Sequence, residues 1–217
     1  RVYHLLNEFL NSELSAFYLD VLKDRLYTYP IAYKPGRAPQ APGLPTQEDL
    51  YTARRSAQTA IYKITDALAR LTAPILSFTA DEVWQSLPHT QGSVHLTLFP
   101  KPDGLAENVG DEFMKEWRLL SEARSSALLW LEEQRREKRI GKSLEAWMLI
   151  NAGYDSKYLN VLSKYESQLP ELFNVSKVTV MQAAGIDLNS FQIQWLSASA
   201  PKCDRCWRHV PDVGSDE

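Results

Sequence analysis

The stretch Glu48–Leu87, EDLYTARRSAQTAIYKITDALARLTAPILSFTADEVWQSL, decides the fold of this chain. Its apolar residues recur at spacings of three and four over 53–71, so at ~100° per residue they form one stripe of an amphipathic helix. Pro74 predicts a break after that helix, because proline has no amide hydrogen to donate. Thr79-Ala80-Asp81-Glu82 predicts a capping box that begins a shorter second helix. Two such helices cannot bury their stripes alone, so the rest of the chain must cover them.

The composition is that of an ordinary folded domain. The chain has 217 residues, of which 44% are hydrophobic and 24% charged, which is enough to build a sizeable core. Its net charge of −3 means that any nucleic-acid surface must be a local patch. No apolar run approaches the ~20 residues that cross a bilayer, so we expect no membrane partner.

The number of cysteines and the first residues of the chain suggest the cellular compartment and the extent of the protein. Two cysteines do not make a disulfide framework, and the sequence shows no signal peptide, so we expect a cytoplasmic protein. The chain begins at Arg1 inside a helical pattern, without a methionine. We therefore expect it to be a piece of a longer protein.

The remaining pattern predicts a mainly α chain with a small α/β part. Two more long amphipathic helices are expected, over 1–26 and over 111–140, and Gly141 is expected to end the second. Residues 29–45 are rich in proline and glycine and predict a loop, while 93–99 alternates weakly and predicts a short extended piece. After Gly141 the spacing of the apolar residues shortens to the alternation of strands. A helix capped by Asp155 is expected between the first strand and the second. The expected strands are 146–150, 177–181 and 191–196. We therefore predict a helical bundle (1–140), an α/β subdomain (141–200) and a separate terminal segment (201–217).

Cys203-Asp204-Arg205-Cys206 in that terminal segment is a C-x-x-C motif. Two thiolates at this spacing can hold half of a tetrahedral zinc shell, which needs four ligands. His209 stands at a spacing that suits a third ligand. The residues alone leave two alternatives open, which are a redox pair and two inert thiols.

Three groups of residues are candidates for contact with RNA. Arg205 and Trp207 flank Cys206, and a cation beside an indole suits phosphate contact and base stacking. The alternative is that Trp207 packs against the turn and Arg205 is solvated. Two basic clusters, one on the central helix and one at the end of the helix predicted over 111–140, can bind phosphates or can be ordinary solvated helix faces with i,i+4 ion pairs. The first is Arg54, Arg55, Lys63 and Arg70, and the second is Arg135, Arg136, Lys138 and Arg139, of which Arg135 and Arg136 are the candidate RNA contacts.

The segment 53–88 resembles the anticodon-binding helical domain of class I aminoacyl-tRNA synthetases of the isoleucyl, valyl and leucyl group. APILSFTADEVW at 73–84 is its most distinctive phrase. NSELSAFYLDVLKDRLYT at 11–28, IGKSLEA at 140–146 and CDRCW at 203–207 resemble the isoleucyl type in particular. The likeness covers nearly the whole chain, with four motifs in the family's order.

The resemblance implies the anticodon-region part of an enzyme that attaches isoleucine to its tRNA using ATP. Neither the HIGH nor the KMSKS nucleotide-binding signature occurs in this sequence, so we expect the catalytic domain to lie outside the chain and the chain alone to be non-catalytic. The isoleucyl type ends in a zinc module of two C-x-x-C pairs, and Cys203 and Cys206, followed by Trp207, match the first pair. Zinc in the full-length protein, tRNA as partner, no DNA and a monomeric state are the corresponding expectations. The alternatives are a valyl or leucyl enzyme and a helical interaction domain that binds no RNA.

Overall fold

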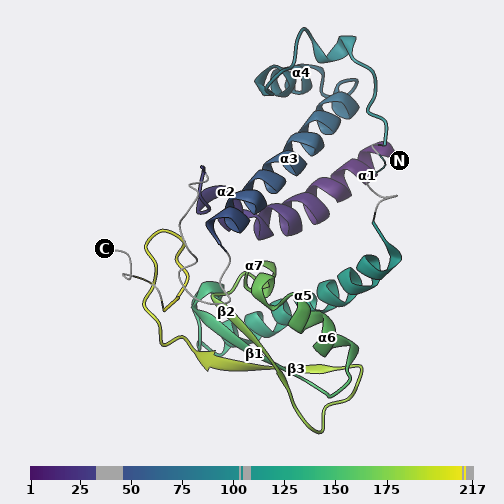
Figure 1. Ribbon diagram of the computed structural model, residues 1–217. Coiled ribbons are helices and arrows are strands. Elements are labelled where there is room, and N and C mark those ends of the chain that lie inside the picture. The colour runs from purple at the N-terminus through teal and green to yellow at the C-terminus, as the bar shows by residue number, and fades with distance from the viewer. Residues whose placement is uncertain (33–45, 103, 105–108, 212, 214–217) are drawn as a thin grey trace. The chain divides into compact units, whose positions relative to one another are not determined.

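The structure is a computed structural model that describes residues 1–32, 46–102, 104, 109–211 and 213. The chain forms two compact units (Figure 1), which are described separately. Unit 1 contains residues 1–24 and 110–217, and unit 2 contains residues 25–109. Most of the loop predicted at 29–45 lies outside the described residues. The three-part division at residues 140 and 200 stays a prediction.

Unit 2 is built on the predicted central helix, α3 (Gln47–Thr72). The helix begins with a capping box that the prediction missed, in which the Asp49 amide donates to Thr46 Oγ1 over 3.1 Å and the Thr46 amide donates to Asp49 Oδ2 over 2.8 Å. It ends two residues before Pro74, as predicted.

The second helix of unit 2, α4 (Ser77–Ser86), corrects the predicted capping box. The helix begins two residues before Thr79, and its N-cap residue, Leu76, makes no side-chain cap bond. Asp81 instead accepts hydrogen bonds from Ser93 Oγ over 2.7 Å and from the Val94 amide over 2.9 Å. These bonds hold η2 (Val94–Leu96), a 3₁₀ turn in place of the predicted extended piece.

The core of unit 2 lies where α3 and α4 meet the 3₁₀ turn. Ala69, Ala73 and Ala80 are buried there, and their small side chains leave room for the Trp84 indole and for Val94. The predicted inward direction of Trp84 is therefore confirmed. Several large apolar side chains of the same unit stay exposed, including Phe78, Leu96 and Leu98.

The first segment of unit 1 differs from the long regular α-helix predicted over 1–26. It consists of α1 (Val2–Glu8), the π-helix η1 (Phe9–Leu19) and α2 (Lys23–Tyr27), which crosses the boundary at residue 24. Asn11 donates its side-chain amide to the Asn7 carbonyl over 2.8 Å, so a side chain competes with the backbone for that acceptor where the π-helix begins. Of the apolar positions in this segment, Leu22 is buried whereas Val2 and Leu5 are exposed.

Helix α5 (Asp111–Arg136) is shorter than the predicted 111–140, and Gly141 does not end it. The chain leaves the helix at Lys138, whose φ of 60° is left-handed. Leu120 and Leu131 are buried as predicted, but Phe113 and Leu128 are exposed. The buried face runs instead through small residues such as Ala123 and Ala127 and through the unpredicted Arg124.

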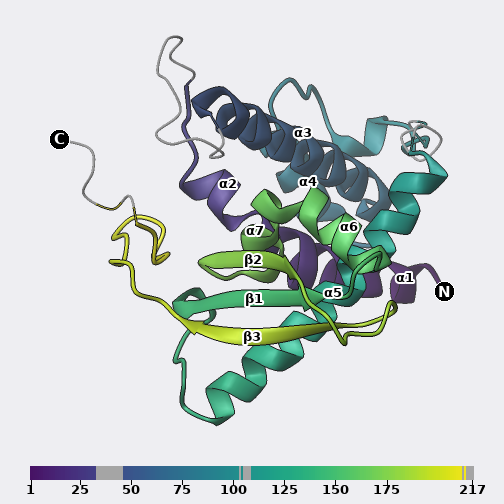
Figure 2. The ribbon, with the colours of Figure 1, turned by 60° about the horizontal axis from the view of Figure 1, so that its bottom comes forward.

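The three predicted strands form one sheet in the order β2-β1-β3 (Figure 2). β1 (Ala146–Ala152) lies in the middle, parallel to β2 (Lys177–Gln182) and antiparallel to β3 (Phe191–Ser197). The chain enters β1 through η4 (Ser143–Glu145), and α6 (Lys157–Lys164), η5 (Glu166–Gln168) and α7 (Leu169–Phe173) connect β1 to β2. Ser156, not the predicted Asp155, caps α6 by accepting from the Tyr158 amide over 3.2 Å.

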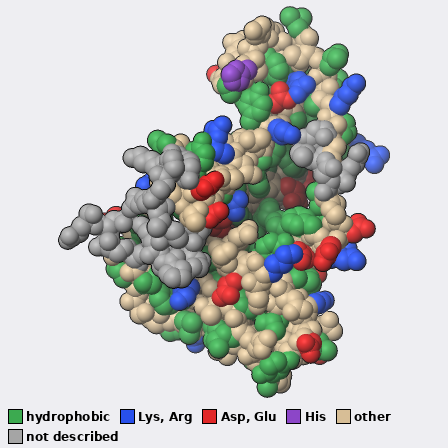
Figure 3. Space-filling view, in the orientation of Figure 1, with side chains coloured by type: hydrophobic (Ala, Val, Ile, Leu, Met, Phe, Trp, Pro, Cys, Tyr) green, Lys and Arg blue, Asp and Glu red, His purple; other side chains and the backbone are tan. Residues whose placement is uncertain are grey.

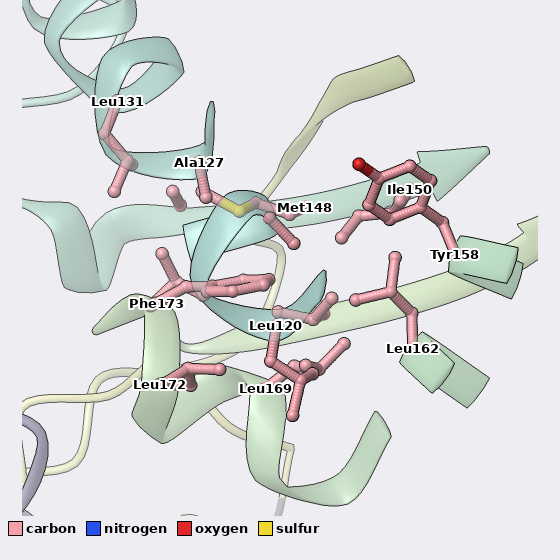
Figure 4. Packing of buried hydrophobic residues seen from close by; sticks show 14 of the residues in the cluster. Leu120, Ala127, Leu131, Met148, Ile150, Tyr158, Leu162, Leu169, Leu172 and Phe173 are labelled. Atoms are coloured by element: carbon pink, nitrogen blue, oxygen red, sulfur yellow. The ribbon is translucent and has the colours of Figure 1, made fainter. Parts of the chain in front are cut away.

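One core joins α5, α6, α7 and the sheet (Figure 4). Met148 and Ile150 are fully buried in β1, and Phe173 of α7 packs in the same cluster. Arg124 is a buried charged side chain beside this core. It donates to the Leu172 carbonyl, and its guanidinium carbon lies 5.1 Å from the centroid of the Phe17 ring. Within the described residues, no helix is long and apolar enough to cross a membrane.

Candidate nucleic-acid interface

The C-x-x-C motif forms a tight turn closed by backbone hydrogen bonds. The Trp207 amide donates to the Cys203 carbonyl over 2.8 Å, and the Cys203 amide donates to the Arg208 carbonyl over 2.8 Å. Trp207 takes a left-handed φ of 64°, which turns the chain back so that Lys202 and His209 form an antiparallel bridge. We call residues 202–209 the knuckle.

The two thiols of the knuckle have different environments. Backbone amides of Cys206 and Arg205 donate to the Cys203 sulfur and hold the pKa of its thiol below the ordinary value. Burial raises the pKa of the Cys206 thiol. Amide donors to a sulfur favour the thiolate, which is the form that binds a metal.

The knuckle fits half of a zinc shell. Cys203 and Cys206 supply two sulfurs, but a tetrahedral structural site needs two more ligands. No three His, Cys, Asp or Glu side chains in the described part of the chain lie close enough together to hold a metal ion. His209, which the spacing offered as a third ligand, therefore does not join the two cysteines there. Its Nδ1 lies 3.1 Å from the Ala200 carbonyl oxygen.

Hydrogen bonds and an ion pair fasten the knuckle to the rest of unit 1. Trp147 Nε1 donates to the His209 carbonyl over 3.1 Å, and the His209 amide donates to Ser176 Oγ over 2.7 Å. Arg208 adds an ion pair of 2.5 Å with Asp24. The knuckle is thus placed at the end of the sheet where β1 and β2 begin.

Trp207 projects from the knuckle with 58% of its surface exposed. The Nζ atoms of Lys142 and Lys202 lie 5.7 and 5.9 Å from the centroid of its ring. The backbone at Lys142 is held in turn by Glu145, whose carboxylate accepts from the Gly141 amide over 2.7 Å and from the Lys142 amide over 3.3 Å. An exposed indole flanked by two ammonium groups combines a stacking surface with phosphate-binding charge.

Lys142 and Lys202 were not predicted from the sequence. Each is a single lysine outside the two basic helical clusters, and only the fold brings them to the same indole. The adjacency of Lys202 to the C-x-x-C motif is the one signal in the sequence that pointed to it. Arg205 is exposed on the same turn, which suits both RNA contact and plain solvation, so its RNA contact stays a prediction.

The basic cluster of α3 does not present four equivalent cations. Arg54 is half-buried, and its Nη1 donates to the Leu26 carbonyl and lies 3.3 Å from the carbonyl oxygens of Arg25 and Tyr29, so it closes the end of α2. Arg70 forms an ion pair with Asp66 one helical turn away. Arg55 and Lys63 are exposed on the same helix.

The cluster at the end of α5 is paired with acidic residues. Arg135 forms an ion pair with Glu132, and Arg136 lies 3.4 Å from Glu133. Figure 3 shows the same mixing, since Lys and Arg side chains are interspersed with Asp and Glu on the face in view. Of the two arginines, Arg136 is the more exposed, with 76% of its side chain open. The RNA contacts assigned to both helical clusters stay predictions.

Comparison with known proteins places the chain in a family. Residues 1–150 match the family described as the anticodon-binding domain of tRNA ligase. The chain belongs to this family. That match includes all of unit 2, the first segment of unit 1, α5 and most of β1, so the packing described above is that of an anticodon-binding domain with a further α/β part and the knuckle.

Curated relatives cover the anticodon-binding domain and the knuckle alike. The chain is 35% identical over 99% of its length to the isoleucine–tRNA ligase of Natranaerobius thermophilus and 38% identical over 98% to that of Syntrophotalea carbinolica. It is 40% identical over 94% of its length to the isoleucine–tRNA ligase of Brachyspira hyodysenteriae. The chain spans only 20 to 22% of the length of these relatives.

Proposed function

We propose that this chain binds the anticodon region of a tRNA as part of an isoleucine–tRNA ligase. Membership of the anticodon-binding family supports tRNA as the ligand. The names of the relatives favour an isoleucine enzyme over the valyl and leucyl alternatives. The observation that carries the proposal is the exposed Trp207 indole between the ammonium groups of Lys142 and Lys202. Unstacked RNA bases bind to aromatic side chains, and neighbouring cations bind the phosphates beside them.

Zinc belongs to the same proposal. Cys203 and Cys206 would hold one zinc ion together with two ligands from elsewhere in the full-length protein, and the metal would supply rigidity to the turn that presents Trp207. Because His209 does not gather with the two cysteines within the described residues, its removal should leave zinc binding unchanged. Metal analysis of the wild-type chain and of Cys206→Ser and His209→Ala tests this. Stoichiometric zinc that is lost in His209→Ala would show a complete local site and contradict the half-site.

The whole protein's properties follow from the proposed identity. ATP and isoleucine would be used by a catalytic domain outside this chain, which itself holds and orients the tRNA. We propose a monomeric cytoplasmic enzyme that binds no DNA. The modules would follow the division predicted from the sequence, with the bundle at 1–140, the α/β subdomain at 141–200 and the start of the zinc module at 201–217.

Salt-dependent tRNA binding tests the interface. Each phosphate contact that is lost should flatten the plot of log affinity against log salt by about one unit, so Lys142→Ala/Lys202→Ala should lower the slope by about two units. Trp207→Ala should weaken binding by about 1–3 kcal/mol with little change in slope, because stacking releases no counterions.

Lys101→Ala/Lys115→Ala is the matched control, since it removes the same charge from two other exposed lysines. Equal slopes for the two double variants would contradict a specific role for the knuckle. Absence of salt-sensitive tRNA binding by the wild-type chain would favour a helical interaction domain that binds no RNA. The same assay with Arg135→Ala/Arg136→Ala and with Arg55→Ala tests the predicted helical contacts.

A further inference from the structure

A groove of about 910 Å³ opens in unit 1 between the second half of α5, the start of α6 and the start of β3. Trp130, Tyr158 and Phe191 contribute aromatic surface to it, and Ser126 and Asn189 contribute polar groups. This volume lies within the range of sites that hold small organic groups. Of the candidate RNA contacts named above, Arg136 alone lines this groove.

The connection between β2 and β3 (residues 183–190) forms one wall of the groove, and three contacts hold it in place. Ser156 Oγ donates to the Leu188 carbonyl over 2.9 Å, which ties the connection to the start of α6. Asp187 then accepts from the Asn189 amide over 2.7 Å, which sets the backbone of the next residues. A Cβ on Gly153 would meet the Ile186 carbonyl oxygen at 2.4 Å, so the connection packs directly on this glycine. The groove is therefore preformed, which lowers the entropy cost of binding.

The chemistry of the groove suits a flat heteroaromatic group. Tyr158 donates its hydroxyl to Glu122 over 2.6 Å and packs edge-on against Phe191 with ring centroids 5.0 Å apart, so it is held as part of the wall. Trp130 and Phe191 are half-buried and line the groove beside it. Asn189 carries both a donor and an acceptor, the combination that reads the edge of a base.

The charges at the rim fit a nucleotide. Arg136 lines the groove, with most of its side chain in solvent, where it can contact a phosphate while a base lies on the aromatic surface. Glu132 and Glu133 also line the groove but form ion pairs with Arg135 and Arg136. A purely cationic ligand would have to compete with those arginines.

We propose that this groove binds one unstacked nucleobase of the tRNA held by the chain, a proposal that rests on the proposed function. The groove is distinct from the knuckle. It lies at the Phe191 end of β3, opposite Ala152, whereas the knuckle is fastened at Trp147, near the other end of β1. Five residues at ~3.4 Å each separate the two ends by roughly 17 Å, so one base cannot occupy both.

Filling the groove without disturbing its walls tests the proposal. Ser126→Trp places an indole in the groove, and Ser125→Trp places the same indole at the neighbouring exposed position of α5, which does not line it. We expect Ser126→Trp to weaken tRNA binding by about 5- to 150-fold, the loss of one stacked base, with an unchanged salt slope. Ser125→Trp should bind as the wild-type chain does.

A second variant tests whether the Asn189 side chain contacts the edge of the base, without filling the groove. Asn189→Leu keeps about the same side-chain volume and adds no charge, but it removes the donor and the acceptor, so it should weaken binding of a tRNA anticodon stem–loop and change its preference among loops that differ at one base. A 2-aminopurine placed at the recognised position should change its fluorescence on binding to the wild-type chain and not to Ser126→Trp. Circular dichroism should show both variants folded.

Three outcomes would overturn the proposal. Equal binding by Ser126→Trp and the wild-type chain, while Trp207→Ala and Lys142→Ala/Lys202→Ala weaken binding, would remove the groove and leave the proposed function standing. Equal weakening by Ser125→Trp and Ser126→Trp would assign the effect to the helix surface in general. Absence of tRNA binding by the wild-type chain would overturn the groove and the proposed function together.

Discussion

Replacing Arg124 by methionine should loosen the packing of α5 against α7 and against the first segment of unit 1. Arg124 is 7% exposed, donates to the Leu172 carbonyl, lies over the Phe17 ring and reaches Asp20 over 3.5 Å. Methionine has a similar reach but no donor, so it leaves the buried carbonyl without a partner.

The structure gives the size of the effect. A hydrogen bond from a charged donor contributes about 1.5–3 kcal/mol, and the cation over Phe17 adds about 0.5–1 kcal/mol. The Asp20 contact adds little, because it is long and the Asp20 side chain is 26% exposed. We therefore expect Arg124→Met to lower the free energy of unfolding by about 2–4 kcal/mol.

Urea unfolding followed by tryptophan fluorescence measures this change. Five of the six tryptophans belong to unit 1 and one, Trp84, to unit 2, so the signal reports mainly on the affected unit. Arg118→Met removes an exposed arginine from the same helix and should change stability by less than about 0.5 kcal/mol. Equal unfolding of the two variants would refute the assigned role of Arg124.

Three further outcomes are expected. Trp84→Ala should destabilise unit 2 by about 3–5 kcal/mol in thermal or urea unfolding, because it empties the centre of the small core; unchanged melting would mean that the core is assigned wrongly. Asp81 has its pKa lowered by hydrogen bonds from Ser93 and from the backbone, so its ionised form stabilises the fold above the ordinary value of 3.8 and this contribution is lost as pH falls through the lowered pKa. Asp81→Asn should therefore be less stable than wild type at pH 7, with a difference that shrinks on acidification, and a constant difference from pH 7 to 2 would contradict this. Gly153→Ala should cost about 1–3 kcal/mol through the clash with Ile186, and an unchanged melting temperature would show that the connection yields freely.

Periodicity predicted the elements better than their ends. The helices α3 and α5 and all three strands lie where the pattern placed them, because a repeating apolar face reports which side of an element is buried. The ends depended on single side chains with distant partners. Asp81 was predicted to be part of a capping box, but it accepts a hydrogen bond from Ser93, twelve residues later.

The candidate site was predicted in part. The C-x-x-C motif marked the knuckle, since cysteine spacing is a local signal. Lys142 was not found because its relation to Trp207 depends on the path of the chain through the whole sheet. Arg54 looked like a surface cation because the pattern could not show that carbonyls at the end of α2 would meet it.

The discontinuity of unit 1 has a consequence for synthesis on the ribosome. Residues 1–24 leave the exit tunnel before the rest of unit 1, but the Trp117 ring and the Arg124 guanidinium, which pack on Phe17, follow only after the whole of unit 2. At about 5–20 residues per second, translating residues 25–109 takes roughly 4–17 s, during which this segment has no native partner in its own unit. Unit 2 can complete its contacts in that interval. Residues 1–24 must therefore stay unaggregated until residues 110–217 are synthesised, and we expect their apolar side chains to bind a chaperone that acts on nascent chains.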